Sequence, residues 1–330
     1  MRSPPAVVAL GGGHGLSASL AALRRLTTDL TAIVTVADDG GSSGRIRREL
    51  PVLPPGDLRM ALAALAGGED GQDRLARLLQ HRFGGTSALA GHPVGNLLIT
   101  GLVELLEGDS VEALATVGRL VGAVGTVLPM SSIPVEIAAT VAGIDPEHPG
   151  EVRRIRGQVA VAATPGQVLA VTLVPDRPPA CPQAVQAIRS ADAVVLGPGS
   201  WFTSVLPHLL VPELLEALVE TPARIVVTLN LAPQPGETEG FSPERHLQVL
   251  SEHAPGLAID TVIADVEAVV DRRGLLDTVR SVGGTLVLAP VSTGDGTPRH
   301  DPERLAAALA PVIGVDTAMQ DLGTSTTGER

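Results

Sequence analysis

The sequence predicts an α/β protein with a mostly parallel β-sheet, helices on both faces, extra helices and a small antiparallel β meander. Short apolar runs alternate with segments of helical periodicity in residues 6–37 and again in residues 182–313. Between them, residues 58–121 show only helical periodicity. Residues 135–174 are rich in β-branched side chains and are interrupted by glycine and proline, which favours short antiparallel strands.

The N-terminal segment predicts a β-α-β unit. An apolar strand at residues 6–10 runs into a glycine-rich segment, residues 11–15, which we call the first glycine loop. An amphipathic helix follows at 16–26, and a second apolar strand at 32–37. Right-handed crossover connections of this kind join strands that pair in parallel.

Helices then dominate until the middle of the chain. The first of them follows a start signal at residues 54–57, where two prolines precede glycine and aspartate. The predicted helices are 58–65, 74–83, 96–106 and 111–121.

Strands and helices alternate again in the C-terminal half. Strands are predicted at 193–196, 224–230, 261–266 and 286–289, and helices at 182–190, 212–219, 243–253, 274–282 and 301–313. Because neither a linker nor a repeat of fixed period occurs, we expect a single composite α/β domain over residues 1–320. The polar, threonine-rich residues 321–330 predict a flexible tail.

Composition excludes several classes of function. The formal net charge is -12, so nucleic acid is an unfavourable partner. All 24 basic residues are arginine, which excludes a Schiff-base lysine and the lysine of a Walker phosphate loop. Any bound phosphate must be held by arginine, backbone NH groups or a metal ion. A single cysteine, Cys181, and the lack of an apolar run of membrane-spanning length predict a cytoplasmic protein without a membrane span.

The first glycine loop is a candidate anion site. It lies between a strand and a helix, where free NH groups and the positive end of the helix dipole favour negative charge. Its candidate ligand-binding residues are Gly12, Gly13, His14 and Gly15. The loop does not match the dinucleotide fingerprint, because Leu16 stands where a small residue is required, and it can also be read as a tight packing turn.

A second candidate follows the next strand, where Asp38 and Asp39 precede a run of glycine and serine. The carboxylates suit Mg²⁺, ribose hydroxyls or general-base chemistry, and alternation along the strand points only one of them at a ligand. Ser42 and Ser43 add a polar cradle, and Arg45 is a candidate phosphate contact, as is Arg59 further along. Ordinary turn chemistry is the competing interpretation.

Two further groups belong to the predicted site. His92 and Asn96 lie at the start of a helix, where His92 is either an acid-base group or a loop-fixing side chain. Residues 197–204, the second glycine loop, repeat the pattern of a strand followed by glycines and a helix start. Asn230 ends another strand, and residues 234–238 follow it either as base or sugar contacts or as a turn. The remaining histidines do not form a metal-binding set with recognisable spacing.

Several motifs occur in one order along residues 6–300: GGGHGL, TVADDGGSSGRIRRE, PPGDLR, GHPVGN, LGPGSWFTS and PQPGETEGF. Together they resemble the bacterial gluconeogenesis-factor (YvcK-like) family, which is related to the 2-phospho-lactate transferases (CofD-like). The resemblance implies a Rossmann-like fold with added helices and binding of UDP-sugars, notably UDP-N-acetylglucosamine. It also implies an influence on cell shape, wall synthesis and carbon metabolism.

The same resemblance assigns site residues and partners. The residues that match the family motifs are Gly12, Gly13, Gly15, Asp38, Asp39, Arg45, Asp57, Asn96, Gly197, Gly199, Ser200, Thr203, Ser204 and Asn230. Arg299 matches a late Arg-His pair and is a diphosphate contact by resemblance. Phe202 and Phe241 replace tyrosines that are frequent in the family. Members are also targets of serine/threonine kinases, which makes Thr324, Thr326 and Thr327 the candidate acceptors.

Two hypotheses of different class follow. The first is a UDP-sugar-binding regulator without turnover that engages wall-synthesis proteins and assembles as a homo-oligomer. The second is a Mg-assisted phospho-transferase in which Asp38 or Asp39 assists catalysis. An NAD-dependent enzyme is a weaker third hypothesis, because the fingerprint does not match. The sequence does not assign a cofactor with certainty, and Mg²⁺ is the one metal it suggests.

Overall fold

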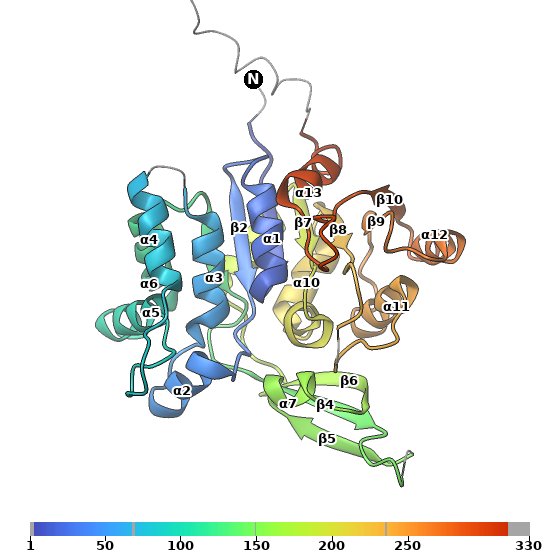
Figure 1. Cartoon of the computed structure of the whole chain (residues 1–330). Coiled ribbons are helices and arrows are strands. Elements are labelled where there is room, and N and C mark those ends of the chain that lie inside the picture. Colours follow the sequence, from blue (N-terminus) through green and yellow to red (C-terminus); the bar gives the residue numbers. More distant parts are fainter. Residues whose placement is uncertain (1–2, 68–69, 149, 235, 316–330) are drawn as a thin grey trace, which may run out of the picture.

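The computed structural model describes residues 3–67, 70–148, 150–234 and 236–315. Within them a seven-stranded, fully parallel sheet has the order β10-β9-β8-β7-β1-β2-β3 (Figure 1). Its strands are β1 (Val7–Gly11), β2 (Leu30–Val34), β3 (Thr126–Pro129), β7 (Ala193–Leu196), β8 (Arg224–Thr228), β9 (Thr261–Asp265) and β10 (Thr285–Ala289). The mostly parallel α/β sheet predicted from the sequence is confirmed.

The strand order reverses between β1 and β7. From β1 the chain moves to β2 and later β3, whereas from β7 it moves the other way to β8, β9 and β10. Right-handed crossovers therefore place the helices of the two halves on opposite faces of the sheet. At such a reversal the loops after the two central strands diverge and leave a crevice at the carboxyl edge of the sheet, where open α/β proteins bind ligands.

Helices cover both faces, and six of those described have proline at the first or second position. Five of these six were predicted from the sequence; α9 was not. The helices on the two faces are α1 (Gly13–Leu23), α2 (Gly41–Glu49), α3 (Pro55–Leu65), α4 (Asp70–Gln80), α5 (Val94–Leu105), α6 (Ser110–Leu120), α8 (Pro182–Ser190), α9 (Leu206–Leu209), α10 (Pro212–Glu220), α11 (Pro243–His253), α12 (Arg272–Ser281) and α13 (Pro302–Leu309). The α3–α6 layer lies beside β2 and β3 (Figure 1).

A separate three-stranded antiparallel sheet lies below the carboxyl edge of the large sheet (Figure 1). It consists of β4 (Glu136–Ala142), β5 (Val152–Arg156) and β6 (Gln167–Val174), with the short helix α7 (Gln158–Ala162). The antiparallel sheet is confirmed, but its order is β5-β4-β6, so β4 is central and the strands do not form a simple meander. The helix between β5 and β6 is long enough to carry the chain past β4 to its other edge.

Three local expectations differ from the structure. The first glycine loop is shorter than predicted, because residues 13–15 already form the first turn of α1. Residues 41–49, expected as a loop and cradle, form helix α2. Strand β3 was not predicted, since its four residues are too few to show periodicity.

Two further expectations concern the chain ends and the membrane. The predicted tail at 321–330, with Thr324, Thr326 and Thr327, lies outside the described residues. In the part of the chain that the structure describes, no single helix combines the length and apolar character needed to cross a membrane. The segments Trp201–Leu209 and Pro212–Glu220 reach that length and apolar character only when counted together, and their axes are bent by 72°.

Candidate functional site

The two glycine loops touch at the point where the strand order reverses. A β-carbon on Gly15 would lie 2.0 Å from the carbonyl oxygen of Pro198 and 2.6 Å from the α-carbon of Gly199. The Ser19 hydroxyl of α1 donates to the carbonyl of Gly197 at 3.0 Å. Glycine is therefore required at position 15 for close approach, and the two predicted loops form one structural unit.

The first loop also packs closely on its other side. A β-carbon on Gly12 would lie 2.5 Å from Oδ2 of Asp57 and 2.5 Å from Cγ2 of Thr35. Gly13 has a φ of +57°, which favours glycine, and begins the first turn of α1. His14 lies in that turn and is exposed. The helix has neither an N-cap side chain that accepts a hydrogen bond nor an acidic residue in its first turn. The Gly13 nitrogen already bonds to the carboxyl of Asp57, so the rest of the first turn is the part that favours an anion.

Asn230 holds the second loop in place. Its amide oxygen accepts from the Gly199 nitrogen at 2.8 Å, and its amide nitrogen donates to the Gly199 carbonyl at 2.8 Å. Sequence analysis proposed Asn230 as a ligand contact, but both ends of its amide are used to position the backbone of the glycine loop. Asn230 therefore positions the Gly199 backbone, and it also lines the pocket described below.

Glu237, for which sequence analysis left open a base or sugar contact or a turn, is the centre of a buried polar cluster. Its carboxylate accepts from the hydroxyls of Ser200 and Thr203 and, at 3.3 Å, from the backbone nitrogen of Phe202. The residue is 6% exposed, and burial raises the pKa of its carboxyl. It therefore orients the π-helical turn η1 (Trp201–Val205), which continues the second glycine loop.

Asp38 and Asp39 point in different directions, as strand alternation predicted. Oδ1 of Asp38 accepts from the Gly40 nitrogen at 2.9 Å, and its Oδ2 lies next to Gly56 at the start of α3. Oδ1 of Asp39 accepts from the Val159 nitrogen at 3.0 Å. Asp38 thus faces the site, whereas Asp39 attaches helix α7 of the small sheet to the carboxyl edge.

Asp57 has the most perturbed carboxyl near the glycine loops. Burial, together with the negative charge of Asp38, raises its pKa from 3.8 to about 7, although the Gly13 nitrogen and Arg59 oppose the change. Asp57 and Asp38 are therefore a pair of neighbouring carboxyls, one of which readily holds a proton at neutral pH. Carboxylate pairs of this kind are suitable either for a divalent cation or for proton transfer.

Four candidate residues from three helices and a loop form one buried chain of hydrogen bonds. Nε of Arg59 donates to Asn96 Oδ1 at 2.9 Å, and Asn96 Nδ2 donates to the Ser42 hydroxyl at 3.0 Å. That hydroxyl lies 2.7 Å from Nδ1 of His92. Burial and the nearby Arg45 lower the pKa of His92, so the imidazole is neutral, and its tautomer decides whether Nδ1 or the Ser42 hydroxyl donates. This series of hydrogen bonds fixes the orientation of the Arg59 side chain.

The remaining predicted contacts are less closely associated with the two loops. Ser43 is buried and its hydroxyl accepts from the Gly56 nitrogen at 3.0 Å. Arg45 donates to the Ala90 carbonyl at 2.8 Å and so anchors the loop before α5. Arg299 lies in the loop after the edge strand β10, is exposed, and pairs with Asp295 at 2.9 Å. The structure therefore does not bring Arg299 into contact with the glycine loops.

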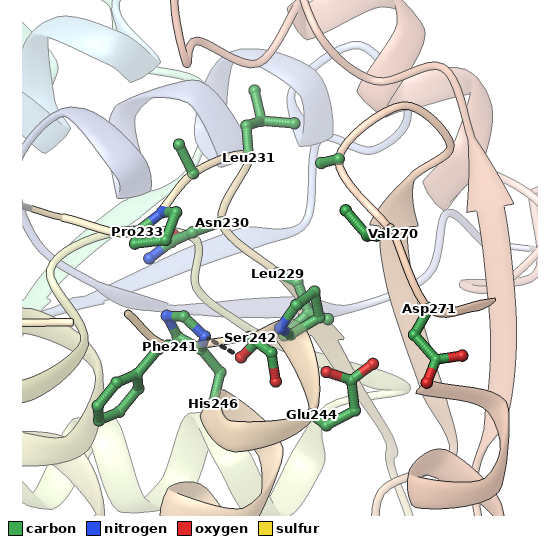
Figure 2. Close-up of a pocket in the computed structure, with 13 residues that line it drawn as sticks. Leu229, Asn230, Leu231, Pro233, Phe241, Ser242, Glu244, His246, Val270 and Asp271 are labelled. Atoms are coloured by element: carbon green, nitrogen blue, oxygen red, sulfur yellow. Dashed lines mark hydrogen bonds between the residues drawn. The ribbon is translucent and has the colours of Figure 1, made fainter. Parts of the chain in front are cut away.

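An apolar pocket of about 280 Å³ opens at the carboxyl ends of β8 and β9, next to Asn230 (Figure 2). Its walls include Phe241 and His246. Nδ1 of His246 donates to the Ser242 carbonyl at 2.9 Å, as Figure 2 shows, and Nε2 has no partner among the described residues. Burial lowers the pKa of His246, so the ring is neutral and Nε2 is a free acceptor. Sequence analysis placed His246 among the histidines without a metal-binding pattern, since a lone histidine in a helix gives no other signal.

A carboxylate and histidine cluster also occurs at the tip of the small sheet. Ligand atoms of Asp145, His148 and Glu151 lie within 4.8 Å of one another, but the group is exposed and Arg153 pairs with both carboxylates. Arg153 therefore occupies the position that a cation would take, and the cluster is an ion-pair network.

Comparison with known proteins identifies relatives over nearly the whole chain. The family model described as 2-phospho-L-lactate transferase CofD matches residues 7–281. A "Putative gluconeogenesis factor" of Mycobacterium tuberculosis is 54% identical over 98% of this chain and 94% of its own length. The "Gluconeogenesis factor" of Bacillus subtilis is 34% identical over 95% of this chain and 99% of its own length. A crystal structure of a UPF0052 family protein from Bacillus halodurans superposes with a TM-score of 0.82 at 32% identity. The superposition covers 94% of this chain and 99% of that one.

Proposed function

The chain belongs to the CofD-like family of gluconeogenesis factors, and from this premise we propose that it binds a UDP-sugar as a regulatory ligand. UDP-N-acetylglucosamine is the proposed sugar nucleotide. In this proposal the ligand controls carbon metabolism, cell shape and wall synthesis in the cytoplasm, through contacts with wall-synthesis proteins and without turnover.

The observation that carries the proposal is the contact between the two glycine loops at the reversal of strand order. A diphosphate needs several NH donors close together and room for its oxygens. The start of α1, which has no N-cap side chain as a hydrogen-bond acceptor, supplies such donors, whereas the NH of Gly199 is already bonded to Asn230. Because there is no lysine in the chain, backbone NH groups, arginine side chains or a metal ion must do this binding.

The pocket of Figure 2 supports the same proposal. It begins at Asn230, which holds Gly199, so a diphosphate in the loops would direct one end of the ligand toward it. Its volume of about 280 Å³ suits a single ring rather than a whole nucleotide. Phe241 supplies an apolar wall, and the free Nε2 of His246 accepts from an NH or OH group of that ring.

A Mg-assisted phospho-transferase is the second candidate, and the pair Asp38 and Asp57 favours it. Burial raises the pKa of Asp57 most, and repulsion from Asp38 raises it further; a divalent cation would relieve that repulsion. These oxygens fit Mg²⁺, and the cation would neutralise charge on a diphosphate. In that reaction Asp57 would hold or release the proton of an attacking hydroxyl.

Calorimetric titration with UDP-N-acetylglucosamine, with and without Mg²⁺, tests the first function directly. We expect saturable binding to the wild type, at least about tenfold weaker binding to Asn230→Ala, and unchanged binding to Arg77→Met on an exposed helix face. An assay for released UMP or UDP runs in parallel. Absence of binding contradicts the proposal, and steady release of nucleotide favours the transferase.

A further inference from the structure

Helix α5 (Val94–Leu105) presents aliphatic side chains to solvent as well as to the core. It lies in the helical layer on the left of Figure 1, where it contacts α3, α4 and α6. Its inner side is buried and carries Asn96 of the candidate site, and Glu104 is its one charged residue. A helix that is apolar on all sides is normally covered on all sides. The outer side of α5 therefore fits a partner outside the chain.

The outward residues of α5 form one continuous row. They recur at intervals of four, three and four positions, which is the spacing with which one helix packs along another. Leu105 is 75% exposed, and Gly101 is exposed at the centre of the row. No other described segment lies within 4 Å of the place that a β-carbon on Gly101 would take, so a second helix can approach closely there. The row consists of Val94, Leu98, Gly101 and Leu105.

The neighbouring helices extend this apolar surface. Leu78 of α4 is 48% exposed and Leu120 of α6 is 50% exposed. The 12 residues of α5 make it about 18 Å long, and three helices about 10 Å apart make a face about 30 Å wide. Such a face covers about 500 Å² on each copy, or about 1,000 Å² when two copies meet, which reaches the size of a specific interface. We call this surface, centred on the row of Val94, Leu98, Gly101 and Leu105, the α5 face.

The charge of the protein selects the partner. Two copies that each carry a net charge of -12 repel one another, so they can dock only through a face with few charges, and the α5 face is such a surface. An anionic membrane surface is unfavourable, because Glu104, Glu107 and Asp109 are exposed at the end of α5 and no arginine occurs in residues 83–118. A second copy of the chain is the partner that fits both the apolar row and its surroundings.

We propose that two copies of this chain associate through the α5 face, with a two-fold axis that passes near Gly101. A two-fold contact uses the same residues on both copies. Leu98 lies three positions before Gly101 and Leu105 lies four positions after it. In an antiparallel crossing, Leu98 of one copy therefore packs against Leu105 of the other, and Gly101 faces its own counterpart. The inference does not rest on UDP-sugar binding, and it gives the homo-oligomer expected from the sequence a specific interface.

Sedimentation velocity of the full chain, at concentrations from about 1 µM to about 100 µM, tests the association. We expect a species of twice 33.7 kDa in the wild type. In Leu105→Glu the dissociation constant of the dimer should rise at least about tenfold, because each copy then brings a carboxylate into the contact. Val219→Glu is the matched control, since it changes another exposed aliphatic residue, on α10, and should keep the wild-type dimer. Urea unfolding verifies that both variants are folded, and Leu105→Glu should bind UDP-N-acetylglucosamine as the wild type does.

Disulfide cross-linking tests the geometry of the contact. Helix axes about 10 Å apart place facing α-carbons about 5 Å apart, which is within reach of a disulfide. Gly101→Cys should therefore form a linked dimer with oxidised glutathione, whereas Val219→Cys should not, and the buried Cys181 does not compete.

Three results would overturn the proposal. The first is a wild type that stays monomeric up to about 100 µM, which would leave the α5 face to a different protein. The second is a dimer of Leu105→Glu as tight as that of the wild type. The third is a Gly101→Cys variant that cross-links no faster than Val219→Cys, since the two copies then meet elsewhere.

Discussion

Replacing Asp57 by asparagine is expected to stabilise the protein, and to do so only when the solution is not acidic. Burial and Asp38 raise the pKa of Asp57 from 3.8 to about 7, so the folded state favours the protonated carboxyl more than the unfolded state does. Its contribution to stability is therefore complete below about pH 4 and is lost as the pH rises through about 7. Asparagine keeps the shape and the acceptor for the Gly13 nitrogen but never carries the charge.

The size of the effect follows from the same pKa values. A change from 3.8 to about 7 corresponds to about 4 kcal/mol, which is the upper bound on the gain in free energy of unfolding for Asp57→Asn near pH 8. Near pH 4 the variant and the wild type should differ little, because both side chains are then neutral.

Urea unfolding followed by circular dichroism from about pH 4 to about pH 8.5 measures this difference. Asp301→Asn is the matched control of opposite sign. Asp301 is the N-cap of α13, it accepts from the Glu303 and Arg304 nitrogens, and these bonds lower its pKa. Its charged form stabilises the fold, so this variant should lose stability at neutral pH and not in acid. If Asp57→Asn and the wild type show parallel pH profiles, the carboxyl is solvated and the reasoning is refuted.

Three further predictions concern the glycine loops. Gly15→Ala should lower the free energy of unfolding by about 3 kcal/mol, because its β-carbon would lie 2.0 Å from a carbonyl oxygen of the second glycine loop. Gly101→Ala, in an open helical position, should raise it by about 1 kcal/mol. Equal effects of the two substitutions in thermal unfolding would contradict the close approach of the loops. Asn230→Ala should lower the free energy of unfolding in urea by about 2 kcal/mol, because Gly199 loses both hydrogen bonds to the amide. Hydrogen exchange at the Gly199 amide should become faster. Unchanged exchange would show that Asn230 does not hold this loop. Glu237→Gln should cost about 2 kcal/mol because its amide nitrogen would face donors, and unaltered stability would show that the carboxylate does not organise the loop.

Much of the fold was predictable because its elements are locally encoded. The helices at 182–190 and 243–253 and the strand at 193–196 were predicted to the residue, since proline starts both helices and the strand is a short apolar run. Helix α2 was missed because its first four residues are glycine and serine, which are unfavourable inside an isolated helix. Packing of Ser42, Ser43 and Ile46 against the rest of the protein decides its conformation.

The site was predictable in kind but not in its internal roles. Glycine loops after two strands indicated an anion site, and the order of motifs indicated the family. The sequence did not indicate that Asn230 binds Gly199 or that Arg59 has a free NH1, because these facts depend on residues up to 37 positions apart. Hydrogen-bond partners of this kind are determined only when the elements pack.

The sequence by itself determined the fold class, the two glycine loops, the reliance on arginine and backbone for anion binding, and the family. These properties follow from local patterning, from the absence of lysine and from motifs in a set order. Tertiary structure alone decided that the loops touch, that Asp38 and not Asp39 faces the site, and that Asp57 has a pKa of about 7. The physical reason is that close approach, desolvation and charge pairing are properties of distances between elements, which a linear pattern does not contain.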